Sequence, residues 1–259
     1  MMTTTLRPSG PLRRFDDGTL SRSYAVCVDS RPVGAVRVGT LRLAGRILGT
    51  IADLRVDEAD RGRGRGAVAA LAAEEVLRGW RCDRVRVSVP AGARAALRLA
   101  AALGYTESGH VLVKGLDPAG AAPPLPAGLE IRPMTDAESA RWIAAEPGRA
   151  ALLPDGPAAA GALLHVAVRD GVRVGHLWTG RRDLPTGDRV PYVWDIAVAE
   201  GERRRGCGRA LMRFAEGLVR AAGGDRLVLR VDPGNAPART LYASLGYRPL
   251  FTDHEKTLH

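Results

Sequence analysis

The chain has 259 residues and carries 38 basic against 28 acidic side chains, which gives a formal net charge of +10. Its 46% apolar and 25% charged residues are ordinary globular values, so a wholly disordered or collagen-like chain is excluded. No apolar run approaches the roughly 20 residues that cross a bilayer, and residues 1–17 lack the hydrophobic stretch of a secretion signal. We therefore expect a soluble, cytoplasmic protein with no membrane partner.

Cysteine usage and charge narrow the range of partners. Cys27, Cys82 and Cys207 are odd in number and widely spaced, which fits neither a disulfide framework nor a zinc cluster, so we expect free thiols and no metal. Residues 1–116 hold most of the excess positive charge, which keeps a nucleic-acid partner under consideration. Only twelve aromatic residues are present, without basic–aromatic interleaving, and nucleic acid is therefore the less favoured partner.

The first half of the chain alternates predicted strands and helices. Short apolar runs indicate strands, and apolar residues at a 3.6-residue period indicate helices. In chain order we expect strands over 24–28, 33–38 and 48–56, a helix over 66–80, a strand over 85–89 and a helix over 94–103.

The second half follows the same order, with an added helix near its start. Residues 117–128 are rich in Pro, Ala and Gly and predict a semi-rigid linker. A strand over 129–132 and a helix over 138–145 come next, then a hairpin of strands 163–168 and 172–178 around an Asp-Gly turn. A strand over 190–198, a helix from residue 209, a strand over 226–231, a helix over 235–245 and an extended end complete the chain. Hairpins combined with helix crossovers predict an α/β (α+β) fold with a central mixed, mostly antiparallel sheet flanked by helices.

The two halves repeat one sequence pattern at an offset of 142 residues. Residues Asp53, Val56, Glu58, Arg61, Arg63, Gly64 and Gly66 recur as Asp195, Val198, Glu200, Arg203, Arg205, Gly206 and Gly208, and the register continues to Lys114 and Lys256. A shared pattern of this length indicates two homologous domains. We place them at 1–116 and 129–259, joined by the linker 117–128.

Each half contains an Arg- and Gly-rich loop between a strand and an amphipathic helix. Glycines let the backbone turn its amides toward one point, and the helix N-terminus adds unpaired N–H groups with a partial positive charge. One Arg-x-x-Gly-x-Gly match is weak evidence in a chain so rich in both residues, whereas two matches in the same context are strong. The loops therefore predict two sites for a polyanionic ligand. No Gly-Lys-Ser/Thr follows either loop, which disfavours a nucleotide-binding P-loop.

These loops resemble the signature of the GNAT superfamily of acyl-CoA-dependent N-acetyltransferases, Gln/Arg-x-x-Gly-x-Gly/Ala between the fourth strand and a long helix. Residues Asn235 to Tyr247 resemble the superfamily's next segment, and the resemblance covers roughly 20–116 and 129–259. It implies two tandem GNAT-like domains, acetyl-CoA as co-substrate without a metal, and transfer of an acetyl group to a primary amine. The cofactor-binding residues that it implies are Ile196, Ala197, Val198, Arg203, Arg204, Arg205, Gly206, Cys207, Gly208, Arg209 and Asn235, with Arg61, Arg63, Gly64 and Gly66 in the first domain.

The same resemblance implies two catalytic residues. Tyr242 would give its proton to the leaving thiolate, since a reference pKa of ~10 against ~8.5 for a thiol keeps it protonated at neutral pH. Asp195 is the one acid on the strand over 190–198, and Ala197 stands where relatives often carry Glu. Asp195 is a candidate base if it points into the cleft, and a structural residue paired with an arginine if it faces away.

Several alternatives remain open at this stage. The first domain has Ala100 and Ala93 where the second has Tyr242 and Asn235, so we expect it to be degenerate and the second domain to be catalytic. His165 and His176 lie in the predicted hairpin, where hydrogen-bonded structural histidines are favoured over substrate contacts. The acceptor is a small-molecule or peptide amine, and the protein is a monomer or homodimer. A non-catalytic acyl-CoA-binding module is the rival function.

Overall fold

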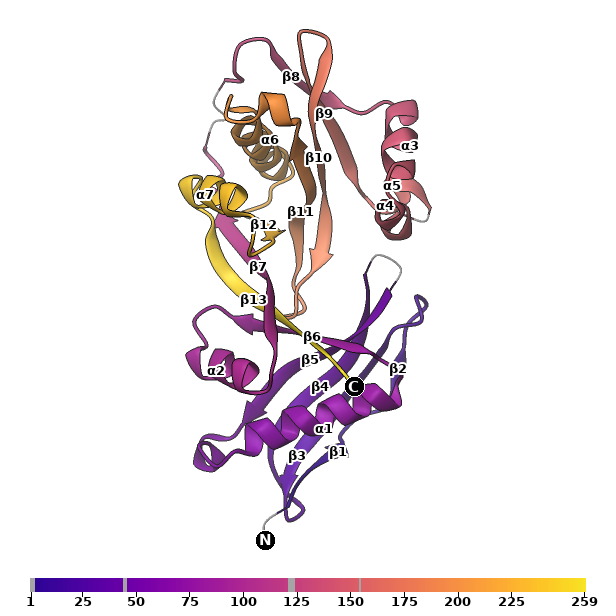
Figure 1. The fold of residues 1–259 in the computed structure, drawn as a ribbon, viewed down its shortest axis with the longest axis vertical. Coiled ribbons are helices and arrows are strands. Elements are labelled where there is room, and N and C mark those ends of the chain that lie inside the picture. The colour runs from indigo at the N-terminus through magenta and orange to yellow at the C-terminus, as the bar shows by residue number, and fades with distance from the viewer. Residues whose placement is uncertain (1–2, 44–45, 121–123, 154) are drawn as a thin grey trace. The chain divides into compact units, whose positions relative to one another are not determined.

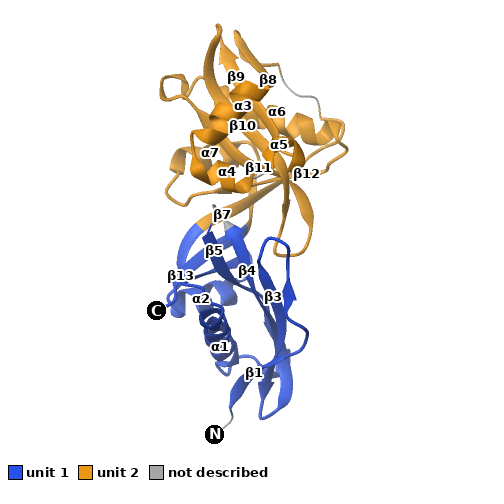
Figure 2. Cartoon of the chain, turned by 90° about the vertical axis from the view of Figure 1, so that its right-hand side faces the viewer, with its two compact units in different colours: residues 1–108, 251–259 blue, residues 109–250 orange. Residues whose placement is uncertain are grey.

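A computed structural model describes residues 3–43, 46–120, 124–153 and 155–259. The chain divides into two compact units, residues 1–108 with 251–259 and residues 109–250 (Figure 2). Residues 121–123 of the expected linker lie outside the described residues. Among the described residues, no helix is both long enough and apolar enough to cross a membrane.

The first unit is a twisted sheet packed against helix α1. Its strands follow the order β1-β3-β4-β5-β6-β13, with β2 beside β3, and all neighbouring strands are antiparallel except β5 and β6. Buried residues Ala69, Ala73 and Leu77 of α1 pack against the valines of β3 and β4. The elements are β1 (Thr4–Pro8), β2 (Arg13–Arg14), β3 (Leu20–Val28), β4 (Arg31–Leu43), β5 (Arg46–Val56), α1 (Arg65–Gly79), β6 (Arg84–Pro90) and α2 (Arg94–Ala102), with residues 251–257 of β13.

The second unit has the same plan with helices on both faces of its sheet (Figure 1). Leu177 contacts the α6 core, whereas its neighbour Trp178 packs with Trp142 of α3, because successive side chains of a strand point to opposite faces. The strand order is β7-β12-β11-β10-β9-β8, with β11 and β12 parallel. The elements are β7 (Thr106–Gly115), β8 (Leu129–Pro133), α3 (Asp136–Ala144), α4 (Pro147–Leu152), α5 (Gly156–Ala159), β9 (Leu163–Arg169), β10 (Val172–Asp183), β11 (Arg189–Val198), α6 (Cys207–Ala221), β12 (Arg226–Val231), α7 (Ala236–Ser244) and β13 (Arg248–Thr257).

The compact units differ from the two sequence repeats by one strand each. Residues 110–115 of β7, at the end of the first repeat, pair with β12 in the second unit. Residues 251–257 of β13, at the end of the second repeat, pair with β6 in the first unit. Each unit is therefore completed by the last strand of the other repeat, an exchange that the repeat pattern did not predict.

The mixed, mostly antiparallel sheets flanked by helices confirm the predicted fold class. Local signals placed most elements within a few residues: Thr135 and Glu138 form a capping box at α3, and Asp170 and Gly171 take left-handed conformations in the hairpin turn. Sequence reasoning missed β1, β2, β7, α4 and α5; except for β7, these elements have six residues or fewer. Packing rather than propensity stabilises such short elements.

Candidate active site

A groove of about 810 Å³ in the second unit opens where strands β11 and β12 separate. The parallel pairing of these strands joins Tyr192 to Val228 and Val193 to Leu229, before the last residues of β11. The groove is lined by Ile196, Ala197, Val198, Arg203, Arg204, Gly206, Gly208, Arg209, Asn235, Pro237, Ala238, Leu241 and Tyr242. Most of the residues predicted to bind the cofactor thus line one cavity together with the predicted acid, Tyr242.

The floor of the groove is the edge of β11. Ala199 donates its N–H to the Val174 carbonyl of β10 at 2.8 Å. Because N–H groups alternate along a strand, the amide of Val198 points away from β10, toward the groove. An amide in this orientation is available to pair with an extended ligand or to stabilise a developing oxyanion.

The N-terminus of α6 forms one end of the groove. Gly206 precedes the helix with φ +82°, and Arg204 has φ +62°, so the backbone reverses sharply before the first helical turn. In the described structure no side chain caps this helix, which leaves its first N–H groups available to an anion. The position equivalent to Arg204 in the first unit is Gly62, with φ +74°, and Gly64 has φ +73°, so both loops share one geometry.

Not every predicted residue faces the groove with its side chain. Cys207 is 1% exposed and belongs to the core under α6. Arg205 donates to Glu202 at 2.7 Å, and Arg209 donates to Ser244 at 2.7 Å while still lining the groove. Asn235 caps α7 by accepting from the Ala238 amide at 3.1 Å. Its contact with a ligand stays a prediction.

Tyr242 of α7 is 6% exposed at the wall of the groove. Burial raises its pKa to about 12, and the negative charge of Asp195 and the nearby Tyr192 add to the effect. The phenol is therefore protonated throughout the neutral range.

Asp195 is held between two cationic or basic side chains. Its Oδ2 accepts from Arg149 at 3.1 Å and lies 3.0 Å from His176 Nε2. Burial raises the pKa of Asp195, but the hydrogen bond and charge of His176, with the charge of Arg149, outweigh burial and lower it. Asp195 is thus an ionised group that pairs with an arginine and a histidine through Oδ2.

Sequence reasoning favoured a hydrogen-bonded structural role for His176, and the structure gives it a hydrogen bond to Asp195; it did not single out Arg149 or Trp142. His176 lies opposite Ala197 in the β10–β11 ladder, and its ring packs edge-on against Trp142 at 5.3 Å between ring centroids. Arg149 lies over the Trp142 ring, 4.1 Å from the centroid. A β-bulge at Trp194 sets the register of β10 and β11 that brings His176 to Asp195. No local sequence motif predicts this bulge. His165, by contrast, packs against Phe214 in the interior.

The residues Arg61, Arg63, Gly64 and Gly66 lie in the first unit, apart from the groove just described. Arg61 donates to the Val56 carbonyl at 2.8 Å, as Arg203 does to Val198 at 3.4 Å. Arg65, at the position of Cys207, is buried and forms an ion pair with Asp60. Helix α2 has Ala93 at its N-cap and no side-chain cap in the described structure.

A sheet opened at a parallel strand pair, with an uncapped helix N-terminus at the opening, has a shape and a polarity that suit an extended, anion-bearing ligand. The Acetyltransferase (GNAT) family model matches residues 3–105 and 132–247. The chain belongs to this family and is an acetyltransferase, whose members use acetyl-CoA as co-substrate.

Individual relatives agree with this membership. The chain is 32% identical over 252 residues to a mycothiol acetyltransferase of Beutenbergia cavernae, covering 85% of this chain and 78% of that protein. It is 31% identical over 242 residues to one of Frankia alni, covering 81% and 71%. A tandem GNAT protein from the clavulanic acid biosynthesis pathway shares the fold, with a TM-score of 0.56 at 19% identity over 95% of this chain and 85% of that one.

Proposed function

We propose that the protein transfers an acetyl group from acetyl-CoA to a primary amine, and that the unit of residues 109–250 performs the reaction. The observation that carries this proposal is the convergence of the Val198 amide, the N-terminus of α6 and Tyr242 on one groove. Acyl transfer from a thioester needs an anion site, an oxyanion donor and an acid for the leaving thiolate. The groove offers one group for each of these tasks.

In this proposal the donor lies along β11. The amides of residues 204–209 hold the pyrophosphate, assisted by the guanidinium groups of Arg203, Arg204 and Arg209. The exposed edge of Ile196, Ala197 and Val198 pairs with the pantetheine amides as an added strand would. The thioester carbonyl then lies near the Val198 N–H, which stabilises the oxyanion.

The reaction proceeds by direct attack. The neutral amine forms a bond to the carbonyl carbon, the oxyanion collapses, and the carbon–sulfur bond breaks. Tyr242 gives its proton to the departing sulfur, and its raised pKa means that it carries this proton at neutral pH. The amine must also lose a proton, for which Asp195 and its partner His176 are the nearest candidates on β10 and β11.

The first unit would bind acyl-CoA without turnover. It retains the loop of Arg61, Arg63, Gly64 and Gly66 but has Ala100 in place of the acid. The mycothiol acetyltransferase relatives make their acceptor a candidate for this chain, within the wider class of small-molecule or peptide amines. A non-catalytic acyl-CoA-binding module remains the second candidate, and a monomer or homodimer is expected.

The test combines purified protein, acetyl-CoA and a panel of amines, with release of free thiol as the readout. Tyr242→Phe is expected to lower kcat by about 10²–10⁴-fold, the range of general acid catalysis, with little change in the KM for acetyl-CoA. Full turnover by Tyr242→Phe would remove the proton-donor role. Tight acetyl-CoA binding with no turnover on any amine would favour the binding module.

A further inference from the structure

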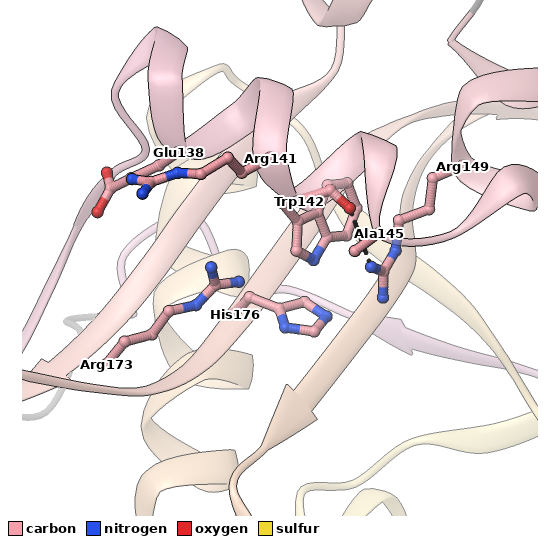
Figure 3. A pocket seen from close by; sticks show the side chains of 7 residues that line it. All are labelled: Glu138, Arg141, Trp142, Ala145, Arg149, Arg173 and His176. Atoms are coloured by element: carbon pink, nitrogen blue, oxygen red, sulfur yellow. Dashed lines mark hydrogen bonds between the residues drawn. The ribbon is translucent and has the colours of Figure 1, made fainter.

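A second cavity, of about 600 Å³, lies between helices α3 and α4 and strand β10. Figure 3 shows side chains from all three elements turned toward its space. It is lined by Glu138, Arg141, Trp142, Ala145, Arg149, Arg173 and His176. The cavity belongs to the second unit. None of these seven residues lines the groove at β11 in which the acetyl donor is proposed to lie, which is called the donor groove below.

The two cavities are each lined by one residue of a cross-strand pair of β10 and β11. His176 is the cross-strand partner of Ala197, which lines the donor groove. Directly paired residues project from the same face of a sheet, with Cβ atoms about 4.5–5.5 Å apart. An amine placed against His176 is therefore close to the part of β11 where the proposed thioester lies.

His176 is held for proton transfer by Asp195. The 3.0 Å contact joins Nε2 to the carboxylate, so in the neutral ring Nε2 donates to Asp195 and Nδ1 is left as an acceptor. Trp142 packs against the ring, and Arg149 donates to the same oxygen of the carboxylate, Oδ2, that contacts His176. The ring is thus oriented by contacts on two sides, as a base with a positioning carboxylate requires.

Charge around the cavity is unbalanced. Among the described residues, no carboxylate lies within ion-pair distance of Arg141 or Arg173, both of which are exposed. Glu138 forms a two-point contact with Arg132 at 2.8 and 2.9 Å and also caps α3. Arg149 is paired with Glu146 and Asp195. The two guanidinium groups with no acidic partner therefore come from helix α3 on one side and strand β10 on the other.

We propose that this cavity is the acceptor site and that it selects amines carrying a carboxylate or phosphate group, with the amine at His176 and the anionic group between Arg141 and Arg173. Arginine binds both anions in two-point contacts, which orients as well as attracts the acceptor. His176 takes the proton of the ammonium group, the amine attacks the thioester carbon, and Asp195 positions the ring. This inference rests on the proposed acetyl transfer and adds the acceptor class and the base.

The test compares matched acceptors: glycine with glycinamide, and phosphoethanolamine with ethanolamine. The wild-type protein is expected to favour the anionic member of each pair in kcat/KM. Arg173→Gln and Arg141→Gln are each expected to lower kcat/KM for the anionic member about tenfold or more, because hydrogen bonds to charged groups are the strong ones. The neutral members should change less than about twofold, since a neutral group loses no charged contact.

Arg226→Gln is the matched control, because Arg226 is also an exposed arginine of the second unit but lies on β12, outside both cavities. This substitution also removes one positive charge, and it should leave the ratio of kcat/KM for the anionic acceptor to kcat/KM for the neutral acceptor unchanged. Equal effects of Arg226→Gln and Arg173→Gln would reduce the preference to general attraction by a basic protein. A wild-type preference for the neutral amines would overturn the acceptor class while leaving acetyl transfer intact.

The assignment of His176 as the base is tested by measuring kcat as a function of pH, with the same acceptor in every measurement. Glu138, Arg141, Arg149, Arg173 and Asp195 are the charged groups around His176, and none of them loses charge near neutrality by ordinary values. Wild-type kcat should show a limb that rises with pH, as catalysis by a base requires, and His176→Gln should lower kcat about 10²–10⁴-fold and remove that limb. Asp195→Asn should lower kcat by less than His176→Gln does and leave the KM for acetyl-CoA unchanged, because it removes the carboxylate that positions the ring but keeps the imidazole. An unchanged limb in His176→Gln would overturn the base assignment.

Discussion

Gly175 shows how one atom sets the geometry of the site. A Cβ at this position would lie 2.6 Å from the Ala197 carbonyl oxygen and 3.4 Å from Leu211. Glycine therefore allows β10 to approach β11 closely, immediately before His176 in the chain. The neighbouring pairs Gly175–Val198 and His176–Ala197 include residues that line the groove at β11, Val198 and Ala197, and one that lines the second cavity, His176.

Gly175→Ala is expected to destabilise the protein by about 1–3 kcal/mol, the usual cost of overpacking, and to lower kcat by displacing His176 from Asp195. Gly217→Ala is the matched control, because Gly217 lies within α6 and a Cβ there meets nothing within 4 Å. Alanine in a helix interior should raise stability by about 0.5–1 kcal/mol without affecting turnover. Urea unfolding and thiol release measure both effects. Equal stability and activity of the two variants would show that β10 and β11 can separate without consequence.

At the scale of elements, the exchanged strands are anchored by the only two lysines of the chain. Lys256 on β13 donates to Glu74 of α1 at 2.8 and 3.0 Å, and Lys114 on β7 donates to Glu216 of α6 at 2.7 Å. The two glutamates are 1% and 0% exposed, and Tyr105 also donates to Glu74 at 2.9 Å. Each buried carboxylate is therefore paired with a lysine on the strand that the other repeat contributes, and Glu216 has Arg213 and Arg220 of its own helix as further partners.

Lys256→Met is expected to lower the free energy of unfolding by about 3–5 kcal/mol, because it leaves the Glu74 charge buried without its partner. The double variant Lys256→Met with Glu74→Met should recover most of that loss, since two apolar side chains of similar volume often replace a buried pair at little cost. Glu75→Gln, which affects an exposed pair with Arg78, should change stability by less than about 1 kcal/mol. Denaturant unfolding separates these cases, and a small effect of Lys256→Met alone would contradict the anchoring role.

The contacts between elements also show which features could be predicted from the sequence and which could not. Local rules were sufficient for the helix capped at Thr135, the Asp-Gly turn and the loop before α6, because cap, turn and glycine signals act within a few residues. The pairing of Lys256 with Glu74 spans 182 positions, and the bulge that brings His176 to Asp195 depends on strand register. Both are decided by tertiary packing, so a local pattern cannot specify them. The repeat aligned Lys114 with Lys256 but did not indicate the acids with which they pair.

At the scale of the whole molecule, both repeats have the Arg- and Gly-rich loop, but the residues around the loop differ between them. Gly64 and Gly206 have nearly the same φ, +73° and +82°, before their helices. The first unit nevertheless has Ala100 and Ala93 at the positions of Tyr242 and Asn235. It also places buried Arg65, paired with Asp60, where the second unit has Cys207. Because the first unit has the same loop geometry but lacks counterparts of Tyr242 and Asn235, we predict that it binds acetyl-CoA without catalysing acetyl transfer.

Calorimetric titration of the full chain with acetyl-CoA tests the prediction that both units bind acetyl-CoA and only the second catalyses acetyl transfer. We expect up to two binding events per chain. Gly206→Trp should remove one of them together with all turnover, because a non-glycine residue at φ +82° strains the loop and the indole enters the groove. Gly64→Trp makes the same change in the first unit and should remove the other event while acetyl transfer continues. Loss of turnover in Gly64→Trp, with Gly206→Trp still active, would reverse the roles of the two units.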